Sequence, residues 1–231
     1  MANLNNLGIV VRQPPRADAA AVAALAKFGV ATIHEAMGRT GLAQPVLQPA
    51  WAGAHLCGTA VTVLAQPGDN WMLHVAAEQV REGDVVVVAC TAQNTDGLFG
   101  ELLATSFRAR GAVGLVTETG IRDVKELTAM QFPAFARAFS ARGTVKATIG
   151  SVNVPVVCAG ALVHPGDVVA ADDDGVVVVP RAIAAEVAAA CAAREEKEAT
   201  NRARFVKGEL GLDIYGMRES LTRAGLRYVD P

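Results

Sequence analysis

Aromatic residues are scarce in this sequence, and neither sign of charge is in excess. Phe, Trp and Tyr together make up 5% of the chain, so a core has to be built mainly from Ala, Val and Leu, which the 52% apolar fraction allows. The formal net charge of −2 provides no basic surface for nucleic acid and no attraction to an anionic membrane. We therefore expect a globular protein with neither a nucleic-acid nor a membrane partner.

Cysteine is also sparse, and its spacing excludes two kinds of site. Cys57, Cys90, Cys158 and Cys191 are far apart, with no CxxC pair and no Cys/His cluster of the zinc type. Apolar residues flank each of them, which is typical of buried free thiols. Free thiols suit a reducing cytoplasm, so we expect a cytoplasmic protein.

Long apolar runs and nucleotide motifs are missing as well. Residues 1–6 lack the basic and apolar regions of a signal peptide, and charged residues interrupt the Ala-rich stretches at 17–26 and 184–193. No GxGxxG or Walker A pattern follows a predicted strand. The sequence therefore predicts no membrane span and no nucleotide cofactor.

Apolar periodicity predicts a layered α/β protein with a mixed sheet. Strand and helix alternate in the middle of the chain, whereas strands follow one another later. The predicted strands are residues 9–11, 58–64, 85–89, 112–117, 168–171 and 176–179, and short strands are expected within residues 132–137 and 145–157. The predicted helices are residues 18–28, 32–37, 70–81, 183–207 and 214–224, besides one in the central segment. We expect an α/β core over residues 1–182 and a helical extension over residues 183–231.

The central segment, residues 97–126, combines a helix, a strand and a charged turn. A helical pattern of apolar residues begins at Leu98 and stops before Gly111, and a short buried strand with a turn at Gly120 follows it. Arg122 and its neighbour Asp123 come directly after this strand. Ligands of open α/β folds bind at the carboxyl ends of strands and the amino ends of helices, so this segment is our candidate site.

The residue types in this segment suit a small 2-oxo acid. Glu101 and Asp123 offer oxygen ligands for a hard cation, Mg²⁺ or Mn²⁺. Arg122 offers a planar fork for a carboxylate or an enolate oxygen, and the free amides of Leu102 and Leu103 can hold a second anionic oxygen. The alternative is an ordinary surface Arg-Asp pair with a Glu that favours the helix start.

These motifs resemble those of the RraA-like family, most closely its class II pyruvate aldolases. Those aldolases cleave 4-hydroxy-4-methyl-2-oxoglutarate or 4-carboxy-4-hydroxy-2-oxoadipate, and their signature is an acid, a gap of twenty residues, then Arg-Asp. Further matching stretches are GTAVTV at 58–63, PGDN at 67–70, GTVK at 143–146, PGDVVAADDDGVVVVP at 165–180 and GELGLDIYGMR at 208–218. One departure is Glu101, where the aldolases usually have Asp.

The resemblance implies a fold, an assembly and an activity. The fold is an α/β/β/α core of the swivelling-domain type with a C-terminal helical extension, in homotrimers that can pair into hexamers. The activity is metal-dependent retro-aldol cleavage to pyruvate and a second 2-oxo acid, either pyruvate or oxaloacetate, with oxaloacetate decarboxylation as a side activity. No Schiff-base lysine is evident. The alternative is a non-catalytic RraA-type inhibitor that binds an RNA-processing endonuclease, although such members tend to lack one of the two acids.

Three further residues are candidates for the same site. Asn70 and His74 lie four positions apart on one face of a predicted helix, and the resemblance places both in the aldolase active site. Asn70 could instead be only a helix cap, and His74 a polar residue at the sheet edge. Lys146 can balance a substrate carboxylate or be an ordinary exposed lysine. The proton acceptor stays open between a water on the metal and His74.

The C-terminal helix carries the last candidate, Glu198. Its charge run at residues 194–198 is typical of a solvated helix face. The resemblance implies that a Glu from this helix completes the neighbouring subunit's site as a metal ligand, and the matching position is Glu198. A second acidic run, residues 172–175, lacks calcium-loop spacing and predicts a β-turn.

Overall fold

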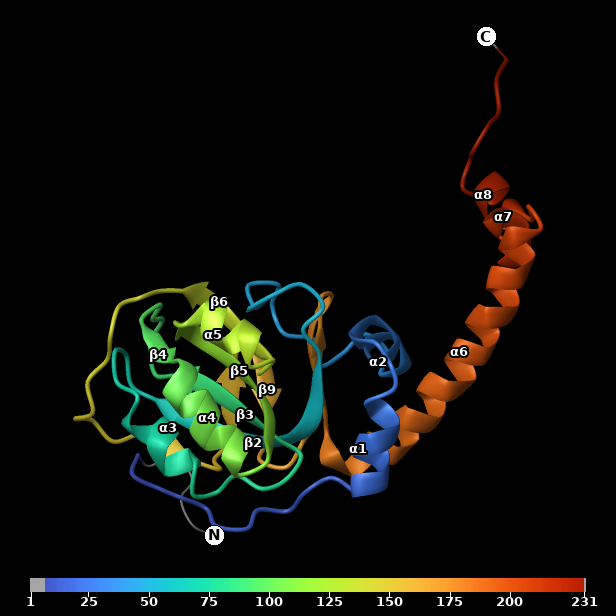
Figure 1. Cartoon of the computed structure of the whole chain (residues 1–231). Helices are drawn as coiled ribbons and strands as arrows, with labels where there is room; N and C mark the ends of the chain where they lie inside the picture. Colours follow the sequence, from blue (N-terminus) through green and yellow to red (C-terminus); the bar gives the residue numbers. More distant parts are fainter. Residues whose placement is uncertain (1–6, 231) are drawn as a thin grey trace.

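The computed structural model describes residues 7–230 and arranges them around one curved, mixed sheet with helices on both sides (Figure 1). The strand order is β1-β6-β5-β3-β2-β10-β11, with β4 beside β5 and β7 beside β2. These strands are β1 (Gln48–Pro49), β2 (Leu56–Ala65), β3 (Asp84–Cys90), β4 (Gly97–Phe99), β5 (Ala112–Ile121), β6 (Ala134–Phe139), β7 (Ser151–Val152), β10 (Val168–Asp172) and β11 (Gly175–Val179). A separate hairpin pairs β8 (Val156–Cys158) with β9 (Ala161–Val163).

The middle of the sheet is parallel and its edges are antiparallel. β2, β3, β5 and β6 pair in parallel, as does β4 with β5, whereas β10, β11, β7 and β1 pair antiparallel with their neighbours. Parallel strands are covered on both faces, which explains the continuous valine run of β3. The carboxyl ends of β4 and β5 therefore lie side by side at one edge.

Helices form the two outer layers. α3 (Trp71–Ala76), α4 (Glu101–Ala109) and α5 (Val124–Ala129) cover the parallel part of the sheet. α1 (Ala19–Leu25), α2 (Val30–Ala36) and the start of α6 (Ala184–Val206) cover β10 and β11. A short 3₁₀ helix, Arg181–Ile183, precedes α6, and α7 (Gly211–Ile214) and α8 (Arg218–Arg223) follow it.

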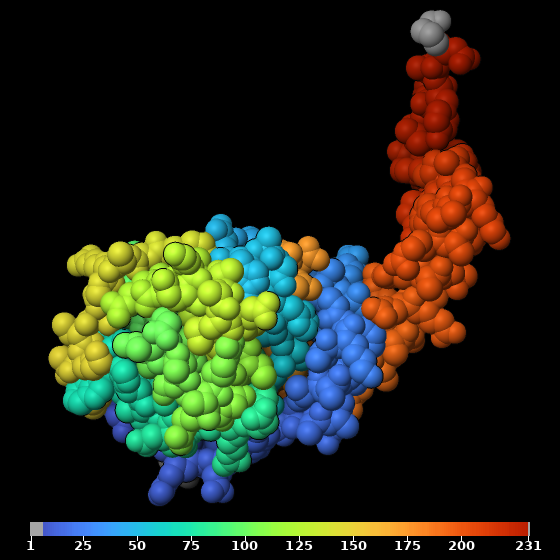
Figure 2. Space-filling view, in the orientation of Figure 1, coloured from blue at the N-terminus to red at the C-terminus, as the bar shows by residue number. Residues whose placement is uncertain are grey.

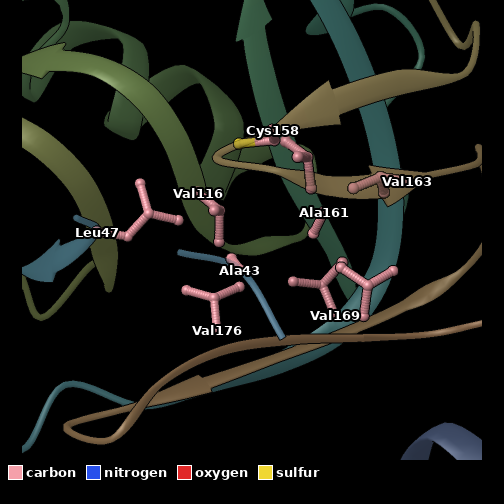
Figure 3. Close-up of a pocket in the computed structure, with 10 residues that line it drawn as sticks. Ala43, Leu47, Val116, Cys158, Ala161, Val163, Val169 and Val176 are labelled. Atoms are coloured by element: carbon pink, nitrogen blue, oxygen red, sulfur yellow. The ribbon is translucent and has the colours of Figure 1, made fainter. Parts of the chain in front are cut away.

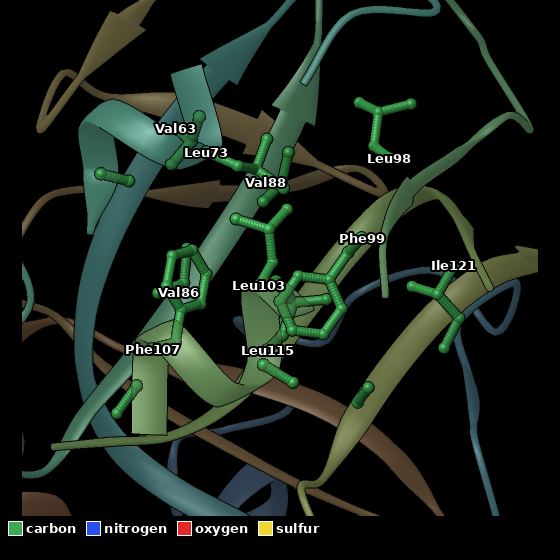
Figure 4. Close-up of a cluster of buried hydrophobic side chains, with 14 of the residues drawn as sticks. Val63, Leu73, Val86, Val88, Leu98, Phe99, Leu103, Phe107, Leu115 and Ile121 are labelled. Atoms are coloured by element: carbon green, nitrogen blue, oxygen red, sulfur yellow. The ribbon is translucent and has the colours of Figure 1, made fainter. Parts of the chain in front are cut away.

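Three apolar clusters separate four layers, which confirms the predicted α/β/β/α fold. Leu73, Leu103 and Phe107 of α3 and α4 pack on the parallel strands in the first cluster (Figure 4). The second cluster lies between the parallel strands and the turned-over β10 and β11, and the third lies beneath α1, α2 and α6. Alternate residues of β10 belong to different clusters, with Val169 in the second and Val168 in the third.

A small cavity lies inside the second cluster (Figure 3). Its lining consists entirely of apolar side chains and one thiol, among them Leu47, Val116, Val176 and Cys158. Apolar cavities of this kind stay dry and offer nothing to orient a polar ligand. Burial raises the pKa of the Cys158 thiol to about 12, so it is not a reactive group. Cys158 and Cys191 are buried as expected, but Cys57 and Cys90 are only partly buried.

Several predicted boundaries were wrong near the central segment. Leu98 belongs to β4 and not to the helix, and the helix predicted over residues 70–81 ends at Ala76. β5 runs on to Ile121, so Gly120 lies within the strand and not in a turn. A Cβ at Gly120 would approach the Thr95 carbonyl oxygen to 2.2 Å, so the glycine serves close packing of the preceding loop. Helix α5 was not predicted at all.

Two smaller predictions have clear outcomes. The strand expected at residues 9–11 is only an isolated bridge from Val10 to Val152. The acidic turn is structural, as predicted: Asp172 Oδ2 accepts the Val30 N–H at the start of α2 at 2.8 Å, and Asp173 accepts the Gly53 N–H. These aspartates therefore fasten a helix and a loop to the sheet.

Helix α6 leaves the body of the molecule (Figures 1 and 2). Its buried residues, Ala184, Val187, Ala188 and Cys191, all lie in its first third, where it packs on α1 and α2. Beyond them the helix, α7 and α8 extend outward with large exposed apolar side chains, including Phe205, Tyr215 and Met217. Between residues 7 and 230 no single helix is long and apolar enough to cross a membrane; α1 and α2 reach that composition only together, across a 118° bend.

Candidate functional site

The Arg122–Asp123 pair and the start of α4 meet because β4 and β5 run in parallel. The Arg122 N–H donates to the Phe99 carbonyl at 2.9 Å, which continues the pairing beyond the two strand ends. The Glu101 N–H then donates to Asp123 Oδ2 at 3.0 Å. Residues more than twenty positions apart in the chain are thereby in direct contact at the amino end of α4.

Gly100 makes this contact sterically possible. A Cβ at Gly100 would lie 2.3 Å from Asp123 Oδ2 and 3.0 Å from Arg122 Cγ. Its backbone is extended, so space and not conformational freedom requires the glycine. Gly97 is also required by space, since its Cβ would lie 2.5 Å from the Ser140 carbonyl oxygen and 3.2 Å from Arg122 Cβ. Sequence reasoning missed both residues, although two glycines just before an acid were a usable signal.

Asp123 is held in an uncommon backbone conformation. It lies in the left-handed region, with φ 56° and ψ 39°, immediately before α5. Its Oδ2 accepts the Glu101 N–H and lies 3.6 Å from Arg122 Nε. Within residues 7–230 its Oδ1 has no hydrogen-bond partner, and the side chain is 38% exposed. The free oxygen is therefore available to a ligand.

The two expected metal carboxylates do not converge in one chain. The Glu101 side chain turns along the helix, where its Oε1 accepts the Thr105 hydroxyl at 2.9 Å. Among the described residues there is no group of three His, Cys, Asp or Glu side chains that could hold a metal ion. Mg²⁺ often takes only one or two protein carboxylates and completes its shell with water and substrate, so Asp123 alone is compatible with such a site.

A pocket opens on one side of this contact and brings together most of the expected substrate-binding residues. Leu102, at the first turn of α4, is 77% exposed at its rim, whereas Leu103 is buried. The N–H groups of both residues have no intrahelical acceptor and face the helix start. The lining residues are Asn70, His74, Leu98, Gly100, Leu102, Leu103, Arg122 and Lys146.

Asn70 presents an unsatisfied polar atom in this pocket. Its side chain is buried, and its Nδ2 donates to the Leu98 carbonyl at 3.1 Å. Within the described part of the chain its Oδ1 has no hydrogen-bond partner. Asn70 occupies the cap position of α3, but its side chain makes no cap bond; the neighbouring Asp69 accepts the Trp71 N–H instead. A buried acceptor without a partner is costly, so a ligand donor is its natural complement.

His74 and Lys146 line the same pocket from two different elements. Both are exposed, and they come from α3 and from the loop before β7. Partial burial lowers the pKa of His74 below its usual 6.5, and the nearby Lys146 charge lowers it further. Lys146 has no ion-pair partner within residues 7–230, so its charge is available to an anion.

A second hollow lies on the other side of Arg122. It is lined by Asp123, Val124, Phe139 and Ser140, together with Ile121, Arg122 and Ala141. Arg122 therefore borders both hollows, while its 44% exposed side chain stays accessible to solvent.

Glu198 is not part of this site within one chain. Its Oε1 pairs with Arg194 Nε at 2.9 Å, one turn earlier on α6. This stretch of α6 lies beyond the buried part of the helix and points away from the body (Figure 1). The solvated-face interpretation therefore holds for the single chain.

Comparison with known proteins now places the chain in a family. The model of a family described as "Aldolase/RraA" matches residues 30–178, which contain the sheet, α3 to α5 and the whole candidate pocket. The chain belongs to the RraA-like family.

Individual relatives of this RraA-like chain carry two kinds of name. A protein of Halalkalibacterium halodurans named "Putative 4-hydroxy-4-methyl-2-oxoglutarate aldolase" is 30% identical over 54% of this chain and 60% of its own length. One of the same name from Pseudomonas fluorescens is 34% identical over 45% of this chain and 64% of its own length. The matched region thus spans less than two thirds of either relative. The crystal structure of Streptomyces coelicolor RraAS2, called an unusual member of the RNase ES inhibitor RraA protein family, has a TM-score of 0.72 at 27% identity, covering 82% of this chain and 98% of RraAS2.

Proposed function

We propose that this protein is a divalent-metal-dependent aldolase that cleaves a 4-hydroxy-2-oxo dicarboxylate or tricarboxylate into pyruvate and a second 2-oxo acid. The observation that carries the proposal is the convergence of Arg122, the open amides of α4 and the Lys146 ammonium around one pocket that also contains His74. These groups complement an anion that gains charge on its 2-oxo oxygen. The names of the aldolase relatives support the same class.

The substrate would be oriented by its two charged ends. The N–H groups of Leu102 and Leu103 suit the carboxylate next to the 2-oxo group, because the helix start favours negative charge. Lys146, across the pocket, suits the carboxylate at the far end. Asn70 Oδ1 suits the C4 hydroxyl, which would give the buried acceptor its missing donor. Both physiological candidates, 4-hydroxy-4-methyl-2-oxoglutarate and 4-carboxy-4-hydroxy-2-oxoadipate, have these groups.

Cleavage requires that the C4 hydroxyl lose its proton, that the C3–C4 bond break and that its electron pair pass to the 2-oxo oxygen. The pocket offers His74 as the proton acceptor, because its lowered pKa keeps the imidazole neutral at pH 7. Arg122 stabilises the enolate oxygen through an interaction that strengthens as charge develops. The enolate then takes up a proton at C3 and becomes pyruvate, while C4 becomes the carbonyl of the second product.

Asp123 would hold the divalent cation through its free Oδ1, and Glu101, whose side chain turns toward Thr105, would act through a bridging water; oxygen-only ligation favours Mg²⁺ or Mn²⁺. A bound cation would supply Lewis-acid polarisation of the 2-oxo group. The αL conformation and the Glu101 N–H fix the Asp123 carboxylate toward this role before any ligand arrives.

We further propose that the site is completed between subunits of a homotrimer or homohexamer. α6 carries Glu198 on a 23-residue helix, roughly 35 Å long, that leads away from its own pocket. The exposed Phe205, Tyr215 and Met217 on the same arm need a partner surface. A neighbouring copy would receive this arm and gain Glu198 as an additional carboxylate near Asp123. Cyclic closure would repeat that contact at every site.

The alternative is a binding protein that inhibits an RNA-processing endonuclease, and the name of the RraAS2 structure favours it. A third activity, decarboxylation of oxaloacetate, uses the same groups, since loss of CO₂ also leaves the pyruvate enolate. We expect it as a side activity of the aldolase.

One set of assays separates these functions. Pyruvate release is followed with both aldol substrates and with oxaloacetate, and an RNase E-like scaffold is titrated in parallel. We expect metal-stimulated release from an aldol substrate, slower release from oxaloacetate and no tight scaffold binding. Borohydride added with pyruvate should leave the activity intact, because no lysine forms a Schiff base. Tight scaffold binding without pyruvate release would reverse the assignment.

A further inference from the structure

A buried aspartate outside the pocket ties two of its walls together. Asp69 is 2% exposed and lies in the turn between β2 and α3. Its Oδ1 accepts the Trp71 N–H at 2.8 Å, and its Oδ2 accepts the N–H groups of Ala147 and Thr148, both at 2.7 Å. One carboxylate therefore joins the first turn of α3 to a loop more than seventy residues later in the chain.

Backbone pairing continues this connection on the other side of Lys146. The Val145 N–H donates to the Gly68 carbonyl at 2.9 Å, and the Asn70 N–H donates to the Val145 carbonyl at 3.1 Å. Lys146 is thus fastened through the residue before it and the two residues after it. Its own side chain has no ion-pair partner within the described residues, so the backbone alone directs it toward the pocket.

We propose that Asp69 is a positioning residue that sets Lys146 against His74 and Asn70 and thereby fixes the distance between the two walls of the pocket. The inference rests on the proposed function only for what Lys146 binds, which is the far carboxylate of the substrate. Asp69 itself touches no substrate, since it is buried beneath the turn.

A carboxylate is the group that this place needs. Burial raises the pKa of Asp69, but three donated backbone N–H groups and the Lys146 charge more than offset the burial, so the pKa is lowered and the group stays ionised. An ionised carboxylate has acceptor capacity for all three N–H groups. An amide in its place would turn one acceptor into a donor and leave at least one N–H opposed by another.

The chain contains a matched control in its second Pro-Gly-Asp turn. Asp167 is equally buried, at 2% exposed, and accepts the N–H groups of His164 at 2.9 Å and Arg181 at 3.0 Å. None of these three residues lines the pocket. Asp167→Asn therefore reproduces the loss of a buried turn carboxylate without disturbing the distance between Lys146 and His74.

The decisive experiment is an NMR titration of the four histidine side chains in the full-length protein, with His74→Asn to assign the signal. Lys146 is the charged group that acts on His74 here; Arg122 lines the same pocket, and Glu78 lies four residues further along the chain. We expect Lys146→Ala to raise the pKa of His74 toward its ordinary value. Asp69→Asn should raise it in the same direction, because the Lys146 loop is no longer held beside His74, and adding Asp69→Asn to Lys146→Ala should change the pKa little further, because the Lys146 charge is then already gone.

Steady-state kinetics provide a second test of the positioning role of Asp69. Asp69→Asn should raise KM for the aldol substrate about 10- to 100-fold, the loss expected for one charge-assisted hydrogen bond, with a smaller effect on kcat. Asp167→Asn should leave KM and the His74 titration unchanged, even where it lowers thermal stability. If Asp69→Asn does not fold, Thr148→Pro removes one donated N–H, keeps the carboxylate and carries the same expectations.

Two failures can be told apart. A folded Asp69→Asn protein with an unchanged His74 titration, or a change equal to that in Asp167→Asn, overturns the positioning role whatever the enzyme does. A wild-type protein that releases no pyruvate overturns the proposed function, while the titration still decides the role of Asp69.

Discussion

Arg122 combines three properties at the scale of single residues. It borders two hollows, its guanidinium lies beside the Asp123 carboxylate, and its side chain stays 44% exposed. An exposed ion pair of this kind contributes little to stability. A role in catalysis therefore explains the position of Arg122 better than a role in folding. Removing the Arg122 side chain should lower the catalytic rate far more than it lowers stability.

Arg122→Ala should lower kcat for the aldol substrate about 10²- to 10³-fold, because it removes one group that stabilises developing charge. Thermal unfolding should change little. Arg110→Ala, at the exposed end of α4, is the matched control and should retain wild-type activity. Wild-type kcat in Arg122→Ala would show that the site lies elsewhere.

His74 predicts a pH dependence with a definite sign. Because its pKa is lowered in the folded state, the unfolded chain binds the proton more tightly. Between the lowered pKa and 6.5, the free energy of unfolding should therefore rise with pH, and above 6.5 this contribution is constant. kcat/KM should fall on the acid side of the same window, as His74 becomes protonated.

Urea unfolding and kcat/KM are measured for wild type and His74→Asn from pH 5 to pH 8. The variant should lose both the acid-side slope in stability and the acid limb of the rate. An identical pH profile in the two proteins would remove His74 from the role of base.

At the scale of elements, the junction of β4, α4 and β5 places the site. Gly100 is the cap residue of α4, and its missing Cβ leaves room for Asp123 Oδ2. Gly29 is the cap residue of α2, where an added Cβ would lie 3.4 Å from Asp172 Oδ2, an ordinary contact distance. Both helices thus begin after a glycine, but only Gly100 is surrounded by atoms that leave no room for a Cβ.

Gly100→Ala should displace the Asp123 carboxylate and reduce kcat by about 10²-fold, since misplacement of about 1 Å has that effect. Gly29→Ala should keep full activity. Equal activity of both variants would mean that the contact between Gly100 and Asp123 does not position the site.

The candidate charged residues of the site could be predicted from the sequence, whereas the residues that position them could not. Arg122 and Asp123 stand out by type and by their place after a strand, whereas His74 became a candidate through the family resemblance. Gly100 and Asp69 act through contacts with residues that are distant in the chain, which local patterns do not contain. β4 was mistaken for helix because its three residues continue the apolar spacing of α4, and only pairing with β5 decides between the two.

At the scale of the whole molecule, the pocket and the C-terminal arm are separate parts of one chain, formed by residues from Asn70 to Lys146 and by the outer part of α6 with α7 and α8. The pocket is lined by residues of α3 and α4, by Arg122 and by Lys146, whereas Glu198 belongs to α6. Beyond its first turns α6 extends away from α3 and α4 (Figure 1). Long-range strand pairing holds the body together. In the arm, Phe205 and Tyr215 pack on each other and still stay exposed, as does Met217, which suits the partner surface that we propose on another copy.

Mixing of subunits tests whether Glu198 of one chain completes the site of another. Glu198→Ala and Arg122→Ala chains, each of low activity, are combined under conditions that permit exchange. Activity should partly return, because some mixed oligomers contain a site with both native residues. A fully active Glu198→Ala protein, or a monomer by light scattering that is catalytically competent, would contradict the shared site.

The central claim is metal-dependent cleavage at Asp123, and its most direct measurement is pyruvate release by protein stripped of divalent cations. Wild-type protein treated with EDTA, with metal content checked by elemental analysis, should release no pyruvate from 4-hydroxy-4-methyl-2-oxoglutarate, and Mg²⁺ or Mn²⁺ should restore turnover. Asp123→Asn should need far more metal for any recovery. Undiminished turnover by metal-free protein, or full recovery of Asp123→Asn at the wild-type metal concentration, would contradict the account.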